Sequence, residues 1–441
     1  MRGATRAHGV RRILIACGAS VLAVAAVVVA PAGGQQSSSL VLHQLASLEG
    51  SAVDAVISEH PDQILELLNS LPRQAAREWP ALPAAARSRL ERDLPSLVGN
   101  LDGVSYTVRD RANRRALTEQ LAAARAAVRT HPSGQAGLLS LAAYTAISAA
   151  LHAKTHPSRH LIEFVPGVRP TAAIAVGNPE TASMVTWAVP GMGTYATDMQ
   201  LWALAAQNLW GSQRDAAAPA DHAVIAWMGY VVPPVGIDAA LGEYATRGAP
   251  ELTEAIQGLA ASRSHDAPTL NVVAHSYGTT MAADALADTP LGVSTFVMLG
   301  SAGVEERIPT AAALHAGAVF AGEAAADAEA GLGRASRSDP RSPGFGAHVL
   351  PVDGDRAAGL AAVTGHAPIL HSAYNDDIRS AVWTAIPAPQ DRQKAFLAHL
   401  AEHGYLDVGT QSLREVGLVT AVARAPVPAP GGTLAGWEGP P

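Results

Sequence analysis

Cysteine is almost absent from this chain of 441 residues, which contains Cys17 and no other. A single thiol cannot form a disulfide within the chain, and it cannot build a metal site from cysteine ligands. Histidine is more plentiful, with 16 residues, but none stands in the HExxH or HxH spacing that is typical of zinc sites. The sequence therefore predicts no metal centre.

Charged residues are also scarce, at 16% of the chain against about 25% in typical soluble proteins. Lys154 and Lys394 are the only lysines, so arginine provides nearly all of the positive charge. The net charge of −7 argues against a nucleic-acid partner, because binding phosphates requires a basic face. No GxGxxG or Walker motif opens a helix, so we expect no nucleotide cofactor.

A hydrophobic run over residues 13–30 follows four arginines at the amino terminus. Positive charges followed by an apolar core are typical of an export signal, and Ala30-Pro31-Ala32 fits a small-x-small cleavage site. The run is also just long enough to span a bilayer as an uncleaved anchor. We therefore expect residues 1–32 to be a signal peptide or membrane anchor. The rest of the chain would be secreted or held at the outer face of the cytoplasmic membrane.

The pattern of apolar residues changes near residue 160. Over residues 40–155 apolar residues recur at intervals of three and four, which predicts a helical region. Over residues 160–405, runs rich in valine and isoleucine alternate with amphipathic segments, which favours a mainly parallel sheet covered on both faces. About eight such runs predict an α/β-hydrolase domain: HLIEFV, AAIAV, MVTWAV, HAVIAW, LNVVA, STFVML, GAVFA and AHVLPV. We expect closing helices over 377–386 and 392–406 and a disordered tail over 425–441.

The stretch AHSYG, residues 274–278, follows the apolar run LNVV and precedes a segment rich in small residues. A catalytic serine must be lifted out of the sheet, and hydrolases do this with a sharp strand–serine–helix turn. That turn needs small residues two before and two after the serine, which are Ala274 and Gly278 here. The pattern predicts Ser276 as a nucleophile, although a serine that only caps the next helix would fit the same residues.

Two backbone amides are expected to stabilise the oxyanion of an acyl-transfer reaction. One is the N–H of Tyr277, because amides at the start of a helix lack partners within the helix. The other would come from PGMGT, residues 190–194, which follows the strand MVTWAV and whose glycines let an amide face the pocket. We choose the N–H of Met192. An ordinary glycine turn is the alternative interpretation of this stretch.

The acid and the base should follow the serine along the chain, with the acid first. The stretch GHAPILHSAY offers His366 and His371, and we prefer His371 as the base because it lies nearer the predicted closing helix. For the acid, Asp327 follows the strand GAVFA, where a carboxylate could orient the imidazole. Asp339 is the alternative acid, although an Asp-Pro pair also initiates turns.

The chain resembles a family of actinobacterial α/β-hydrolase-domain proteins of unknown function. The resemblance covers roughly residues 95–380 and is carried by LVGNLDGVSYTVRDRANRRAL, AAIAVGNPETASMVTWAVPGMGT, IAWMGYVVPP, VVAHSYGTT, FVMLGSAGV, SDPRSPGFGAHVLP and HSAY. It implies an α/β-hydrolase fold with Ser276 as the nucleophile and His371 as the base. The chain departs from the family at Ala274 and Leu370, where glycine is usual.

The stretch GNLDGVSYTVRDRAN, residues 99–113, belongs to this resemblance but precedes the predicted sheet. Its polar residues have the spacing of a loop that leads into a helix: Asn100, Asp102, Arg109, Asp110 and Asn113. We expect them to cap helices and to form a salt bridge to the hydrolase domain rather than to contact a substrate.

Together these features predict an exported serine hydrolase that cleaves a small-molecule or lipid ester through an acyl-enzyme, without a cofactor. The apolar stretch WMGYVVPPVGI, residues 227–237, suggests an apolar acyl group. An envelope acyltransferase that replaces water with an alcohol is one alternative. A non-catalytic binding module that uses the helical region as a partner surface is another, but such a module would need neither Ser276 nor His371.

Overall fold

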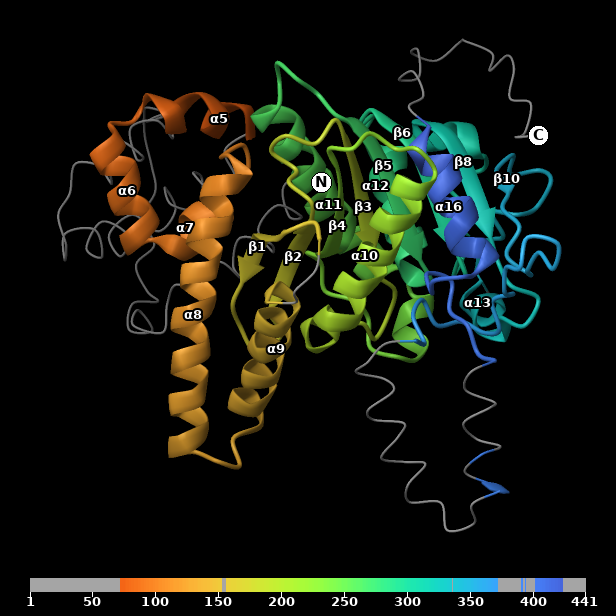
Figure 1. The fold of residues 1–441 in the computed structure, drawn as a ribbon, viewed down its shortest axis with the longest axis horizontal. Helices are drawn as coiled ribbons and strands as arrows, with labels where there is room; N and C mark the ends of the chain where they lie inside the picture. Colours follow the sequence, from red (N-terminus) through yellow and green to blue (C-terminus); the bar gives the residue numbers. More distant parts are fainter. Residues whose placement is uncertain are drawn as a thin grey trace.

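The computed structural model describes residues 72–152, 156–334, 336–371 and 401–422, together with 390, 391 and 393. The predictions for residues 1–32, 377–386 and 425–441 therefore lie outside the described residues. The described chain forms a helical region at one end of a sheet that has helices packed on both faces (Figure 1). Within this part of the chain, none of the helices has both the length and the apolar character needed to span a bilayer.

The central sheet contains eight strands, and each predicted apolar run supplies one of them. In chain order the strands are β1 (Arg159–Val165), β2 (Thr171–Val176), β3 (Met184–Val189), β4 (His222–Met228), β5 (Thr269–His275), β6 (Val293–Leu299), β8 (Ala316–Gly322) and β10 (His348–Val349). Their order across the sheet is β1-β2-β4-β3-β5-β6-β8-β10. The β1–β2 and β2–β4 pairs are antiparallel and the others are parallel, which confirms the mainly parallel sheet.

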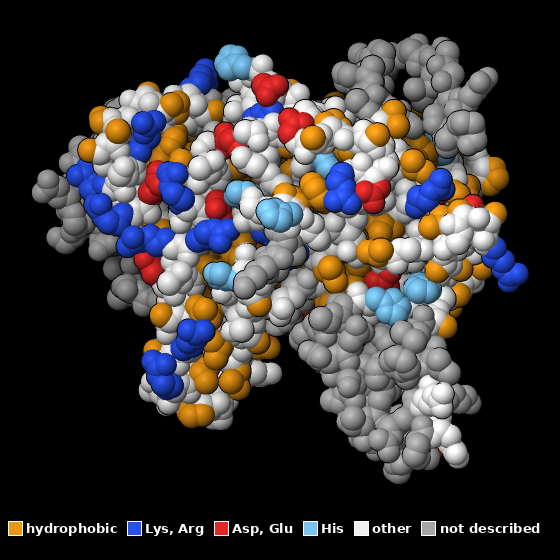
Figure 2. All heavy atoms as spheres, viewed as in Figure 1, with side chains coloured by type: hydrophobic (Ala, Val, Ile, Leu, Met, Phe, Trp, Pro, Cys, Tyr) orange, Lys and Arg blue, Asp and Glu red, His pale blue; other side chains and the backbone are white. Residues whose placement is uncertain are grey.

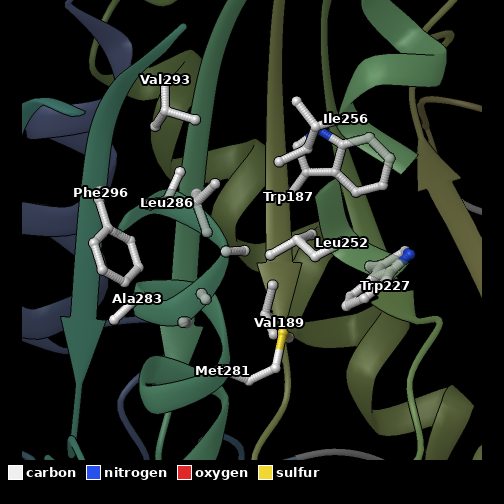
Figure 3. Close-up of a cluster of buried hydrophobic side chains, with 14 of the residues drawn as sticks. Trp187, Val189, Trp227, Leu252, Ile256, Met281, Ala283, Leu286, Val293 and Phe296 are labelled. Atoms are coloured by element: carbon white, nitrogen blue, oxygen red, sulfur yellow. The ribbon is translucent and has the colours of Figure 1, made fainter. Parts of the chain in front are cut away.

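Helices cover the sheet because alternate side chains of each strand point to opposite faces. On one face, Trp187 and Val189 of β3 pack with α11 (Glu243–Ser262) and α12 (Tyr277–Asp288), as Figure 3 shows. On the other face, Ala188 packs in a second core with α10 (Met199–Asp215) and α16 (Gln411–Ala421). The mostly apolar central strands are therefore buried on both sides, as the sequence predicts.

Short elements complete the α/β domain that contains the sheet. They are the 3₁₀ turns η1 (Ala196–Asp198), η2 (Ile237–Ala240) and η3 (Ala311–Leu314), the helix α13 (Ala328–Gly333), and the strands β7 (Val304–Glu305) and β9 (Arg337–Ser338). The last two pair into a small antiparallel sheet that the sequence analysis does not predict. Two-residue strands carry no readable periodicity, which is why they escape a search for alternating patterns.

The closing part of the domain differs from the prediction. A helix was expected over residues 392–406. Residues 392 and 394–400 lie outside the described residues, but residues 403–406 are irregular, and the last helix in the described part of the chain is α16. Gly404 lies so close to the neighbouring loop that a Cβ atom there would be 2.7 Å from the carbonyl oxygens of Ala367 and Pro368. The hydroxyl of Thr410 then caps α16 by accepting the N–H of Leu413. Tertiary contacts therefore override the apolar spacing of this segment.

The helical region contains α5 (Pro72–Ala81), α6 (Ala84–Asp93), α7 (Pro95–Gly99), α8 (Tyr106–Thr130) and α9 (Gln135–Leu151). These helices confirm the prediction of a helical region before the sheet. On the face shown in Figure 2, arginine side chains gather over this region. Some are paired with acidic groups, such as Arg111 with Glu91 at 2.8 Å. Its basic charge is therefore partly neutralised.

The stretch 99–113 joins the helical region to β1, an edge strand of the sheet. The side-chain amide of Asn100 accepts the N–H of Phe164 at 2.9 Å and donates to its carbonyl at 2.8 Å. In the same way, Asp110 accepts the N–H of Leu161 at 2.6 Å. Because these side chains satisfy backbone groups that an edge strand leaves unpaired, they shield that edge. The stretch thus anchors the helical region to the edge of the sheet.

Candidate active site

Ser276 stands at the sharp turn between β5 and α12. Its backbone has φ 54° and ψ −129°, a positive-φ conformation that a non-glycine residue seldom adopts. The turn is compact because a Cβ atom at Gly278 would lie 2.4 Å from the carbonyl oxygen of Pro190. Only glycine at that position lets α12 start so close to the loop after β3. The strained turn places the serine at the carboxyl end of the sheet, as the motif predicts.

A histidine and an aspartate complete a hydrogen-bonded chain with Ser276. The Nε2 atom of His366 lies 2.7 Å from the Oγ of Ser276, and its Nδ1 lies 2.9 Å from both carboxylate oxygens of Asp327. If Nδ1–H donates to the carboxylate, Nε2 carries the lone pair that accepts the serine proton. This is the geometry of a nucleophile, a general base and an orienting acid.

The structure corrects the assignment of His371 as the base. His371 packs against His403, with ring centroids 5.2 Å apart, and its Nε2 contacts the carbonyl of Glu402. The imidazole at Ser276 is that of His366, the residue that the sequence analysis placed second. The preference for His371 rested on its position relative to a predicted helix and on the family resemblance, and neither fixes which imidazole meets the serine. The loop that carries both histidines instead folds back so that the earlier one meets the serine.

Asp327 is held in its place by several donors. It caps α13 by accepting the N–H groups of Glu329 and Ala330, and its Oδ2 accepts the hydroxyl of Tyr405 at 2.8 Å. Burial by itself raises the pKa of Asp327, but the hydrogen bond and charge of His366 outweigh it and lower the pKa to about 2. The carboxylate is therefore ionised at neutral pH and can stabilise a protonated imidazole.

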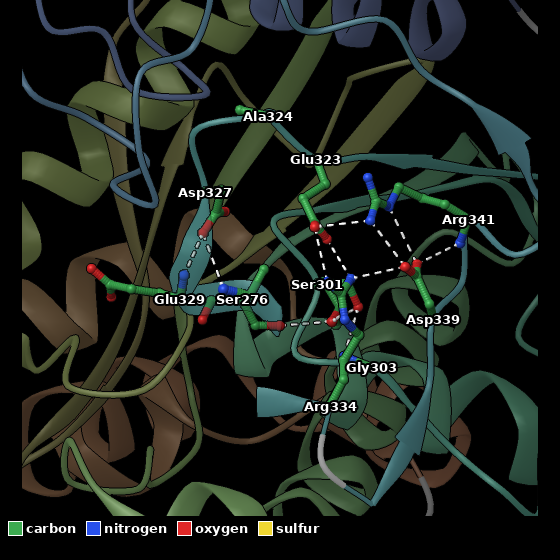
Figure 4. Close-up of polar contacts among 12 residues, drawn as sticks. Ser276, Ser301, Gly303, Glu323, Ala324, Asp327, Glu329, Arg334, Asp339 and Arg341 are labelled. Carbon is green, nitrogen blue, oxygen red and sulfur yellow. Dashed lines mark hydrogen bonds and ion pairs between the residues drawn. The ribbon is translucent and has the colours of Figure 1, made fainter. Parts of the chain in front are cut away.

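Asp339, the alternative acid, lies in a different cluster. It pairs with Arg341 at 2.9 Å and with Arg334 at 3.3 Å, and both arginines also contact Glu323. Figure 4 shows this group of charges apart from Asp327, which faces the amide of Glu329. Burial alone would raise the pKa of Asp339, but the hydrogen bonds from Arg341 outweigh burial, so the pKa lies below its ordinary value. Asp339 is thus a partner of arginines, whereas Asp327 is the carboxylate at His366.

The loop after β3 lies directly against the serine. The backbone of Gly191 is so close that a Cβ atom there would be 2.5 Å from the Cβ and 3.0 Å from the Oγ of Ser276. The loop is fixed by the hydroxyl of Tyr230, which donates to the carbonyl of Pro190 at 2.7 Å, and by the N–H of Gly193, which donates to the carbonyl of Pro233. The predicted donor Met192 therefore belongs to a loop that hydrogen bonds hold beside the serine. The other predicted donor, Tyr277, is the first residue of α12.

Replacing Gly191 by alanine is expected to slow acylation of Ser276 about 100-fold, because the new methyl group must displace the serine or the loop by about 1 Å. The measurement is the rate of covalent labelling by a fluorophosphonate. Gly211→Ala is the matched control, since a Cβ atom at Gly211 in α10 would have nothing within 4 Å. Equal labelling rates for the two variants would contradict the close approach of the loop.

Two further side chains position the base and the acid: His275 contacts the loop of His366, and Tyr405 contacts Asp327. The Nε2 of His275 lies 2.7 Å from the carbonyl oxygen of His366, so its N–H can hold the loop that carries the base. The hydroxyl of Tyr405 accepts a hydrogen bond from the N–H of Ala324 and donates one to the carboxylate of Asp327. Burial, followed by the neighbouring His366 ring, lowers the pKa of His275 to about 3. His275 is therefore neutral at physiological pH, with a ring proton available for the carbonyl.

This pKa predicts a dependence of stability on pH. An unfolded histidine has a pKa near 6.5, so between this pH and pH 3 the side chain of His275 is protonated in the unfolded chain and neutral in the folded protein. Stability that is fully present above pH 6.5 should fall as the pH decreases towards 3, by about 1.4 kcal/mol per pH unit from this residue. Denaturant unfolding from pH 7 to pH 4 would measure it, with His275→Gln as the comparison. Parallel pH profiles for the two proteins would contradict the prediction.

Sequence reasoning overlooked the supporting residues for an identifiable reason. His275 precedes the serine in the motif, but no pattern reveals that its ring reaches the backbone of His366, which is 91 residues away. Tyr405 lies in a segment that the apolar spacing assigns to a helix. The sequence did offer one signal for His366, because the glycine and proline of GHAP favour a loop. The surroundings of His371 also favour a loop, so this signal does not distinguish the two histidines.

Comparisons with known proteins agree with this architecture. Residues 166–333 match the family model described as alpha/beta hydrolase. The uncharacterized protein Rv2079 of Mycobacterium tuberculosis is 30% identical over 290 residues, which is 58% of this chain and 44% of that protein. An uncharacterized protein of a second M. tuberculosis strain matches to the same extent. The chain spans less than half the length of these curated relatives.

Solved structures show weaker likenesses. A dienelactone hydrolase from Anabaena variabilis is 15% identical, with a TM-score of 0.29 over 41% of this chain and 79% of that chain. The esterase PE8 is 14% identical, with a TM-score of 0.30 over 48% of this chain and 97% of that chain. TM-scores this low carry no weight for the fold or the function. The assignment of the fold depends on the family match and on the strand order of the sheet.

Proposed function

We propose that this chain, which contains a domain of the α/β-hydrolase family, is an exported serine hydrolase that cleaves an ester through an acyl-enzyme intermediate. The observation that carries the proposal is the hydrogen-bonded chain from Asp327 through His366 to Ser276. A binding module has no need of a strained serine, an imidazole and an ionised carboxylate hydrogen-bonded in this order.

In the proposed reaction, Nε2 of His366 takes the proton of Ser276 as Oγ attacks the carbonyl carbon of the ester. The imidazolium that forms is stabilised by Asp327 and then gives its proton to the leaving alcohol. Water attacks the acyl-enzyme in the second half of the reaction, with His366 again acting as the base. The products are the carboxylic acid and regenerated Ser276.

Negative charge on the carbonyl oxygen needs donors that are already in position. The N–H of Tyr277 points along the axis at the start of α12, where helix amides lack intrahelical partners. The N–H of Met192 is the proposed second donor, supported by the contact between its loop and Ser276. Because both donors belong to the backbone, their positions depend on the fold of the loop and the turn rather than on side-chain rotamers.

The choice of an ester is supported by the surroundings of the site. The loop after β4 packs on the 190–193 loop, and it presents apolar groups such as Val235, which is 78% exposed. The nearby cations Arg334 and Arg341 are paired with Glu323 and Asp339, so they are poorly suited to bind a charged substrate. We therefore propose an apolar acyl group. Export follows from the hydrophobic run 13–30 and is part of the proposal.

The test combines covalent labelling with product analysis. The folded protein should react with a fluorophosphonate at a single serine, and it should hydrolyse 4-nitrophenyl esters, with rates that rise from acetyl to longer acyl chains. Adding a glycerol or sugar acceptor and measuring free acid against new ester separates hydrolysis from acyl transfer. A folded protein that neither reacts with the probe nor cleaves any ester of the series would overturn the proposal.

A further inference from the structure

A second group of chemically reactive side chains lies next to the candidate active site. His371, His403 and Asp407 each offer one ligand atom, and the three atoms lie within 4.8 Å of one another. His371 ends the described part of the loop that carries His366, and the other two belong to the segment before α16. No residue of the hydrogen-bonded chain at Ser276 is a member, so this group needs an explanation of its own.

The donor set has a clear chemical preference. Two imidazole nitrogens and one carboxylate oxygen suit borderline transition ions such as Zn²⁺ and Co²⁺ better than Mg²⁺ or Ca²⁺, which favour oxygen ligands alone. Zinc bound to nitrogen and oxygen at about 2.0 Å needs ligand atoms roughly 3.3 Å apart in a tetrahedral site. The three atoms would therefore move together by about 1 Å on binding, and a fourth position would remain for water.

The neighbouring backbone orients two of the three ligands. The carbonyl of Glu402 accepts from Nε2 of His371, and in this tautomer Nδ1 carries the lone pair that a metal requires. Asp407 is 1% exposed. Its Oδ2 accepts the N–H groups of Leu370 and Gly404, while its Oδ1 accepts that of His371 at 3.1 Å. Backbone partners that hold the far side of a ligand are typical of metal sites.

His403 supplies a separate observation. Its Nδ1 atom is buried, and it has no hydrogen-bond partner within the described part of the chain. A buried ring nitrogen without a partner is uncommon, because most buried polar atoms are satisfied by protein or water. This nitrogen belongs to the same group as His371 and Asp407, so a metal ion that accepts its lone pair would explain why it has no hydrogen-bond partner.

We propose that His371, His403 and Asp407 bind one divalent transition-metal ion, with Zn²⁺ the best match. The ion would join two segments that already pair through their backbones. The N–H of Thr364 donates to the carbonyl of His403 at 3.0 Å, and the N–H of Leu406 donates to that of Pro368 at 2.8 Å.

These two segments also carry groups of the candidate active site. The first contains His366, and the second contains Tyr405, which donates to Asp327. The metal site thus stabilises the position of the base and of the acid from outside the reaction. It takes no part in the bond-making steps.

The experiment uses the full chain without a polyhistidine tag, stripped with a chelator and dialysed. Titration with Zn²⁺ by calorimetry should give one ion per chain, and Co²⁺ should produce visible absorption bands of a four-coordinate site. Saturating Zn²⁺ should raise the thermal midpoint by several degrees, because only the folded chain brings the three ligands together. Each readout is independent of catalysis, so the Ser276→Ala protein should bind the ion equally well.

His403→Ala is the decisive variant, because His403 does not hold the backbone as Asp407 does. We expect it to weaken Zn²⁺ binding at least about tenfold and to abolish the thermal shift. His265→Ala, which removes an exposed histidine from the turn before β5, should leave both unchanged. The proposal would be overturned if the wild-type chain did not bind Zn²⁺, or if His403→Ala bound it as tightly as the wild-type chain.

Discussion

Ser276→Ala is expected to abolish covalent labelling by a fluorophosphonate and to lower ester hydrolysis at least about 10⁴-fold. The alanine side chain has no oxygen to attack the ester, and neither His366 nor the backbone amides can replace the nucleophile. Intact-protein mass spectrometry would measure the labelling, and release of 4-nitrophenol would measure the hydrolysis. The thermal midpoint should change little, because alanine can adopt the same turn at a similar conformational cost.

The matched control for this prediction is Ser262→Ala. The hydroxyl of Ser262 bonds to the carbonyl of Leu259 at the end of α11, and it has no contact with the hydrogen-bonded chain. It should keep the labelling and the hydrolysis of the wild-type protein. If Ser276→Ala still acquires one label per chain, another residue is the nucleophile, and the proposed reaction would be wrong.

His366→Ala should lower the rate of labelling and of hydrolysis by at least about a thousandfold. Without the imidazole, the proton of Ser276 has no acceptor at 2.7 Å, and the carboxylate of Asp327 cannot reach it directly. His371→Ala should cost far less, because the ring of His371 lies against His403 and Glu402. The difference between these two variants tests the choice of the base.

His265→Ala again serves as a histidine control away from both sites. The reverse result, in which His371→Ala loses the activity and His366→Ala retains it, would restore the assignment drawn from the sequence. Circular dichroism of each variant would distinguish a lost base from a misfolded loop. A rate that recovers when imidazole is added to His366→Ala would further identify the missing group as the base.

The sequence by itself determined much of the architecture. Runs such as MVTWAV and STFVML are mostly apolar and do not alternate with polar residues, a pattern typical of a strand buried on both faces, and the structure buries every residue of both. The position of Ser276 could also be read, because a strand, a serine between small residues and a helix are all local features. Asp327 was found by its position just after a strand, and the structure places it against an imidazole.

The tertiary structure decided what depends on contacts between distant residues. His366 and His371 stand five positions apart in a loop without periodicity, so nothing local distinguishes the one that meets a serine 90 residues earlier. Likewise, the irregular segment around Gly404 has helical spacing, but its packing against Pro368 excludes a helix. The grouping of His371, His403 and Asp407 also could not be read from sequence spacing. Local patterns specify elements because each element satisfies its own backbone, whereas a site is assembled from loops whose positions only the whole fold determines.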